Sequence, residues 1–212
     1  RRVGEIKVYV GKKDIYRPFI LCEYLHAMGN SCGGMKEYWE VFENEPMAQG
    51  GCIWDWVDQN FREIDKDGKW YWTYGGDYGP EGIPSFGNFC GNGLVNAVRE
   101  PHPHLLEVKN IKATLSDRKN LKVCIKNWYD FSNLNEYILR WNVKGEDGTV
   151  LAEGTKEVDC EPHATVDVTL GAVKLPNTVR EAYLNLSWSR KEATPLVDTD
   201  WEVAYDQFVL AG

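Results

Sequence analysis

A carboxylate that closes an apolar run is the residue best suited to chemistry in this sequence. Residues 19–22 read Phe-Ile-Leu-Cys, and Glu23 follows them directly, with His26 close behind. A continuous apolar run is typical of a strand covered on both faces. A charge at its end is expected to be paired, for example with an arginine of a neighbouring strand, or used. In an α/β barrel the C-terminal ends of the strands carry the active site, so we expect catalysis here.

A second acid closes a second apolar run. Cys52-Ile53-Trp54 follows two glycines and ends at Asp55. Between the two runs lies the apolar stripe of a helix, which Pro46 ends and which is formed by Met35, Tyr38, Trp39 and Phe42. Residues 19–55 therefore predict strand, helix, strand, as in a parallel crossover. We interpret Asp55 and Asp58 as acids that cap or bridge loops, not as catalytic partners of Glu23.

The rest of the first half is less regular. Residues 1–16 fit a helix or a strand, and residues 57–96 show no clear period, which predicts a long functional loop. Leu105, Val108 and Ile111 predict a helix that ends near Ala113.

Short alternating apolar runs replace this texture from about residue 116 onward. They predict an antiparallel β-sandwich of about 95 residues. We therefore expect two domains, residues 1–115 and residues 116–212. The predicted fold class is α/β plus all-β, with the sandwich of the immunoglobulin-like kind. Trp128, Trp141 and Trp188 are expected in the core of the sandwich, and Trp56 in the core of the first domain.

Composition excludes several classes of function. The 212 residues carry a formal charge of −8 without a basic cluster, which argues against nucleic acid and anionic membranes as partners. No apolar run approaches the roughly 20 residues of a membrane span. The six cysteines form no CxxC pair, so we expect reduced, packed thiols.

The start of the chain suggests a segment of something longer. It begins Arg1-Arg2-Val3, with neither an initiating Met nor a signal sequence. A closed eight-stranded barrel takes about 250 residues, so the first half is either the tail of a barrel or a different, smaller fold. For the parent protein we favour the cytoplasm, with the periplasm as the alternative.

Four motifs resemble the large bacterial β-galactosidases of glycoside hydrolase family 2. They run in the family order and read ILCEYLHAMGN, QGGCIWDWVDQ, NFCGNGLV and REPHPHLLEVK. The resemblance implies the C-terminal portion of a (β/α)8 TIM barrel followed by the sandwich. It implies that Glu23 is the nucleophile of a retaining glycosidase for terminal β-D-galactosides of the lactose type.

The resemblance also implies roles for the residues around Glu23. His26 would contact a sugar hydroxyl, while Trp54 and Phe89 would line the sugar pocket. The Phe89 carbonyl and the Asn92 amide oxygen would be two ligands of a sodium ion, since hard cations prefer oxygen. Mg²⁺ and Na⁺ are thus implied for the full-length enzyme, and neither site is expected to be complete in this chain.

The acid/base glutamate of the family lies on an earlier barrel strand, outside these residues. We therefore expect the parent to be an enzyme, with a β-galactoside as substrate, and the isolated chain to be inactive. The sandwich would brace the barrel, and subunit contacts in a homo-oligomer stay an open alternative. Two other readings remain: a non-catalytic carbohydrate-binding or structural sandwich, and a family hydrolase for another sugar, a β-glucuronidase or β-mannosidase.

Overall fold

The computed structural model describes residues 2–176, 179–195 and 197–211. The chain divides into two compact units between Val108 and Lys109, earlier than the boundary expected between residues 115 and 116. Each unit is described by itself. Within the described ranges, no helix is long and apolar enough to span a membrane.

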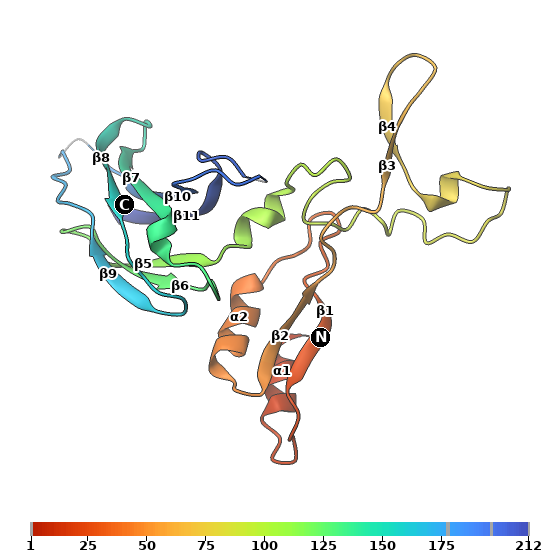
Figure 1. Ribbon diagram of the computed structural model, residues 1–212, viewed down its shortest axis with the longest axis horizontal. Helices are drawn as coiled ribbons and strands as arrows, with labels where there is room; N and C mark the ends of the chain where they lie inside the picture. Colours follow the sequence, from red (N-terminus) through yellow and green to blue (C-terminus); the bar gives the residue numbers. More distant parts are fainter. Residues whose placement is uncertain (1, 177–178, 196, 212) are drawn as a thin grey trace. The chain divides into compact units, whose positions relative to one another are not determined.

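The first unit begins as the strand–helix–strand pattern predicts. Its first four elements are α1 (Val3–Val10), β1 (Phe19–Tyr24), α2 (Met35–Asn44) and β2 (Ala48–Ile53). β1 and β2 pair in parallel, with Tyr24 opposite Ile53 at their C-terminal ends (Figure 1). The ambiguous N-terminal segment is therefore a helix, and the strand, helix, strand prediction for residues 19–55 is confirmed.

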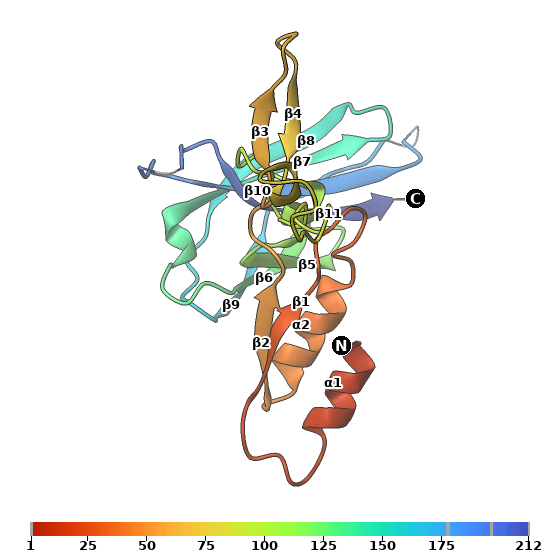
Figure 2. The same ribbon diagram turned by 90° about the vertical axis from the view of Figure 1, so that its right-hand side faces the viewer.

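Among the described residues of the first unit, the two helices cover one face of this two-stranded sheet. Leu21 and Tyr24 pack with Ile6 of α1 and Val41 of α2 in one buried cluster. Figure 2 shows the ribbons of α1 and α2 beside the two strands. On the other face Ile20 is 62% exposed. The prediction that β1 is covered on both faces is thus wrong for this chain, because α1 and α2 both lie on the side of Leu21.

A hairpin occupies part of the stretch that the sequence predicts to be a loop. β3 (Phe61–Ile64) pairs antiparallel with β4 (Trp70–Thr73). Asp65 closes the turn, because its carboxylate accepts hydrogen bonds from two backbone N–H groups of the turn. Short 3-10 turns follow at Gly75–Asp77 and Pro103–Glu107. The helix predicted to reach Ala113 is wrong, since a strand begins at Ile111.

The second unit consists of two antiparallel sheets. One has the order β5-β6-β9 and the other β11-β10-β7-β8. The strands of the first sheet are β5 (Ile111–Asp117), β6 (Lys122–Asn127) and β9 (Thr165–Thr169). Those of the second are β7 (Tyr137–Gly145), β8 (Val150–Glu157), β10 (Ala182–Arg190) and β11 (Glu202–Ala211), with a 3-10 turn at Leu134–Glu136 before β7.

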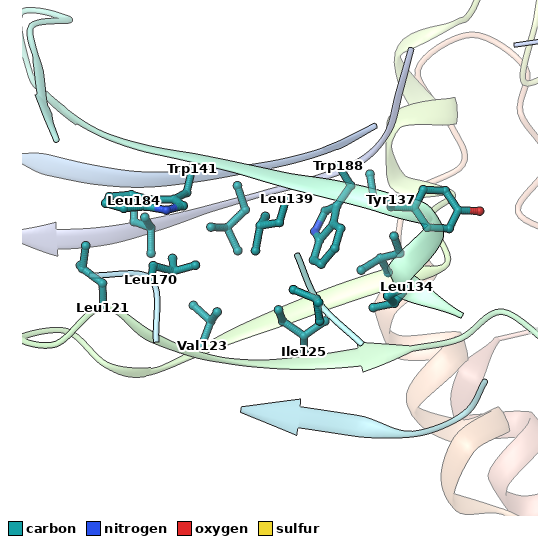
Figure 3. Close-up of a cluster of buried hydrophobic side chains, with 14 of the residues drawn as sticks. Leu121, Val123, Ile125, Leu134, Tyr137, Leu139, Trp141, Leu170, Leu184 and Trp188 are labelled. Carbon is teal, nitrogen blue, oxygen red and sulfur yellow. The ribbon is translucent and has the colours of Figure 1, made fainter. Parts of the chain in front are cut away.

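Alternation along the strands places the core between the two sheets. Figure 3 shows Leu139 and Trp188 of one sheet facing Val123 and Ile125 of the other, and all four are fully buried. This follows from the two-residue period of a strand, which sends every second side chain to the same face.

The tryptophans do not all lie where the sequence predicts. Trp188 and Trp141 are buried, as expected. Trp128 is partly buried but lies outside the core cluster, with the ammonium groups of Lys126 and Lys112 4.9 and 5.6 Å from its ring centre, so its assignment to the core is wrong. Trp56 of the first unit is 59% exposed, and it is not part of a core in this chain.

Candidate active site

Glu23 lies near the C-terminal end of β1 and is exposed. Across the described ranges, no hydrogen bond or ion pair involves its side chain. Its neighbour Tyr24 is buried, and burial raises the pKa of the Tyr24 phenol, so the ring stays neutral. Tyr24 packs edge-on against Tyr38 and Phe42 of α2, at centroid distances of 5.3 and 5.6 Å. The end of β1 is thereby fixed by packing, while the carboxylate beside it stays open to a ligand.

Backbone hydrogen bonds hold the end of β2 beside the loop that follows β1. The Trp54 N–H donates to the Tyr24 carbonyl over 3.2 Å, and the Ala27 N–H donates to the Trp54 carbonyl over 2.8 Å. Trp54 is 42% exposed, and His26 is half-buried. Trp54 and His26 therefore border the strand end that carries Glu23.

The segment around Asn92 joins the same group. The Asp55 N–H donates to the Asn92 carbonyl over 2.6 Å, and the Leu94 N–H donates to the Asp55 carbonyl over 2.9 Å. Phe89 is 62% exposed, and its ring centre lies 6.1 Å from that of His26. His26, Trp54, Phe89 and Asn92 thus come from three loops that hydrogen bonds and a ring contact bring together.

Asn92 offers an unused oxygen. Its side chain is 1% exposed, and its amide nitrogen donates to the Phe89 carbonyl over 3.0 Å. The amide oxygen is buried and has no hydrogen-bond partner within the described part of the chain. Burying a polar atom without a partner costs free energy, so this oxygen is suited to bind a cation or to accept a hydrogen bond. The described residues contain no cluster of three or more His, Cys, Asp or Glu for a metal.

Asp55 and Asp58 have partners of their own. Asp55 accepts hydrogen bonds from the Trp56 N–H at 2.5 Å and from the Gln59 amide at 3.0 Å. Asp58 is within hydrogen-bond distance of His102, and 2.8 Å separates Oδ2 from Nε2. The Asp55 carboxylate thus caps its own loop, whereas Asp58 bridges to residues 93 and 102, which agrees with the sequence-based interpretation that these acids cap or bridge loops.

Sequence reasoning assigned no role to His102 and His104. The Nε2 atom of His104 donates to the Gly29 carbonyl over 3.1 Å, which fixes the loop after β1. The signal was the Pro-His-Pro-His stretch at residues 101–104, but its partners lie far away in the sequence. Only a three-dimensional structure could connect them.

The sequence matches models of known families in both of its units. Residues 4–116 match the model described as "Glycosyl hydrolases family 2, TIM barrel domain". The chain belongs to glycosyl hydrolase family 2. Its first unit is thus part of the family 2 TIM-barrel domain, and residues 123–211 match the model "Beta-galactosidase, domain 4", a β-rich domain here.

Two curated relatives of this family 2 chain are named Beta-galactosidase. A protein named Beta-galactosidase from Priestia megaterium is 39% identical over 97% of this chain and 21% of its own length. A Beta-galactosidase from Klebsiella pneumoniae is 39% identical over 97% of this chain and 20% of its own. The chain therefore spans about a fifth of the length of these relatives. A solved exo-chitosanase from Amycolatopsis orientalis aligns at a TM-score of 0.37 and 14% identity, over 55% of this chain and 13% of that one.

Proposed function

We propose that this chain is the nucleophile-bearing segment of a retaining glycosidase that cleaves terminal β-D-galactosides, such as lactose. One observation carries the proposal: Glu23 lies exposed at the C-terminal end of a barrel strand, beside Trp54 and His26. A carboxylate in that position can attack an anomeric carbon, and water then releases the sugar from the glycosyl-enzyme intermediate.

The surrounding groups suit a sugar ring. The exposed rings of Trp54 and Phe89 offer apolar faces to the C–H surface of a pyranose. His26 offers ring nitrogens that can donate to or accept from a hydroxyl group. We propose galactose, and not glucuronic acid or mannose, because the curated relatives are named Beta-galactosidase.

The second carboxyl group of the mechanism is expected outside this chain. A retaining glycosidase needs two carboxyl groups about 5–5.5 Å apart. Asp55 and Asp58 are already held by backbone and side-chain partners, so neither is free to act as the acid and base. The remainder of the parent chain is therefore a required partner, and the isolated 212 residues are expected to be inactive.

Two cations belong to the proposal. Phe89 and Asn92 would contribute a carbonyl and an amide oxygen to Na⁺, and the buried, unpartnered Asn92 oxygen supports that assignment. The ion would supply a fixed positive charge for polar groups of the substrate. No ligand of Mg²⁺ is placed on this chain, since its site would lie elsewhere in the full-length enzyme.

For the second unit we propose an immunoglobulin-like β-sandwich. Its strands divide as first, second and fifth against seventh, sixth, third and fourth, which is the pairing of sandwiches related to fibronectin type III domains. The alternative function is a non-catalytic carbohydrate-binding module. It is less favoured because it does not explain a carboxylate at the end of β1. We also propose that a second copy of the parent protein is a partner, in a homo-oligomer.

The test uses the full-length parent protein. Glu23→Gln should lower hydrolysis of a nitrophenyl β-D-galactoside by about a thousandfold or more, because the nucleophile is lost. A 2-deoxy-2-fluoro-β-D-galactosyl fluoride should add one fluorosugar to the peptide that contains Glu23, as read by mass spectrometry. Glu37→Gln, on the exposed face of α2, is the matched control. Normal turnover by Glu23→Gln, or labelling of another acid, would overturn the proposal.

A further inference from the structure

Asp58 is a mostly buried acid that no step of the proposed chemistry uses. Its side chain is 11% exposed, and each of its oxygens has one partner. Oδ1 accepts a hydrogen bond from the Gly93 N–H over 2.7 Å, and Oδ2 lies 2.8 Å from Nε2 of His102. A mostly buried carboxylate whose two oxygens both form hydrogen bonds restrains the segments that carry its partners.

One of those partners lies next to the proposed sugar site, which is lined by His26, Trp54 and Phe89. Gly93 directly follows Asn92, in the segment that also carries Phe89. The Asp58 N–H donates to the Val95 carbonyl over 2.9 Å, so main chain and side chain hold the same segment. A Cβ atom on Gly93 would lie 2.2 Å from the Asp58 nitrogen, so the two backbones are in direct contact.

The pair also reaches the loop that follows Glu23. The ring centres of His102 and His104 lie 5.6 Å apart, edge to face. Nε2 of His104 is 3.1 Å from the Gly29 carbonyl, which can only accept, so this nitrogen carries the proton. Gly29 belongs to the same loop as His26. One set of contacts therefore runs from Asp58 to both loops.

We propose that Asp58 is a positioning residue of the sugar site and acts through its pair with His102. It holds the Phe89–Asn92 segment by the Gly93 N–H, and it holds the His26 loop through His102 and His104. The inference rests on the proposed function, since it takes these loops as the walls of the glycosidase pocket. A displacement of about 1 Å in such walls can lower a rate about a hundredfold.

The experiment compares variants of the full-length parent. His102→Gln can keep a donor near the position of Nε2, whereas His102→Leu and Asp58→Ala remove the pair. Asp147→Asn is the control, because Asp147 also accepts a backbone N–H, from Thr149 in a turn of the second unit. Rates on a nitrophenyl galactoside are divided by the number of active sites titrated with the fluorosugar. Hydrogen exchange is followed in peptides that cover residues 25–34 and 88–95.

We expect Asp58→Ala and His102→Leu to lower kcat per titrated site about tenfold to a hundredfold and to speed exchange in both peptides. His102→Gln and Asp147→Asn should stay within about threefold of the parent. Unchanged kcat and exchange in His102→Leu would overturn the inference, even if Asp58→Ala fails to fold. If the parent hydrolyses no galactoside, the proposed function fails, while the exchange data still decide whether Asp58 fixes the two loops.

Discussion

Gly93 shows how tightly the candidate site is built. A Cβ atom on this residue would lie 2.2 Å from the Asp58 nitrogen and 2.4 Å from the Val57 carbonyl carbon. Both are backbone atoms, which cannot move aside as a flexible side chain would. The segment that carries Phe89 and Asn92 can therefore approach the end of β2 only because residue 93 has no side chain.

Gly93→Ala is expected to destabilise the first unit by about 3 kcal/mol, because the added methyl group forces two backbone segments apart. Urea denaturation measures the change, with the transition of the second unit as an internal reference. Gly75→Ala is the matched control, since no atom lies within 4 Å of its Cβ position. Equal midpoints for the two variants would contradict the close approach described here.

The strands of the second unit show what local sequence can predict. Along β7 and β10 every second residue is buried, so period-two alternation identified them correctly. β5 was missed because the spacing of Leu105, Val108 and Ile111 also fits a helix. Its strand form depends on pairing with β6, which a local pattern does not contain. Trp128 follows the end of β6, and its residue type alone does not show that it lies outside the core.

Trp188→Ala tests the core at β10. Its indole is fully buried, so truncation should cost the second unit about 3–5 kcal/mol through the cavity left behind. Trp128→Ala, at the partly buried position beside Lys126, should cost less, about 1–2 kcal/mol. Denaturant unfolding measured by circular dichroism gives both values. A loss for Trp128→Ala as large as that for Trp188→Ala would show that Trp128 belongs to the core.

Tyr129 makes the second unit sensitive to alkali. Burial, with a hydrogen bond to Tyr137, raises the pKa of its phenol, and the two rings are stacked 5.4 Å apart. The folded state thus favours the protonated phenol. Its stabilising contribution is complete below the unfolded pKa of about 10 and is lost as pH rises toward the folded value.

Tyr129→Phe should therefore reduce the loss of stability between pH 8 and pH 11. At pH 8 the variant loses about 1 kcal/mol with the hydrogen bond. Urea midpoints at the two pH values measure the slope. In Tyr183→Phe the slope should change much less, because the hydrogen bond to Glu181 that raises the pKa of this phenol is exposed and screened by solvent. A parental slope in Tyr129→Phe would show that other groups cause the alkaline sensitivity.

The two units differ in how completely each buries its own apolar residues. The second has a core between two sheets, whereas the first leaves Ile20, Trp56 and Phe86 at 62%, 59% and 94% exposure. Sequence motifs were enough to place Glu23 at a strand end. They could not predict the contact of Asp58 with His102, because residues 44 apart in sequence meet only after the chain folds.

The isolated chain is expected to self-associate through its first unit, because large exposed apolar patches are unfavourable in water. Residues 109–212 expressed alone should be monomeric and unfold cooperatively. Light scattering after size-exclusion chromatography measures both molecular masses. A monomeric full chain, or an aggregated second unit, would contradict this expectation.

The cysteines of β1 and β2 allow the exposure of the uncovered sheet face to be measured by thiol alkylation. Cys22 and Cys52 are exposed free thiols, whereas Cys160 in the second unit is buried. An alkylating reagent should therefore modify the two strand thiols of the native chain well before Cys160, without any engineered label. Within the full-length parent, slow alkylation of the same two thiols would report that the rest of the barrel has covered them.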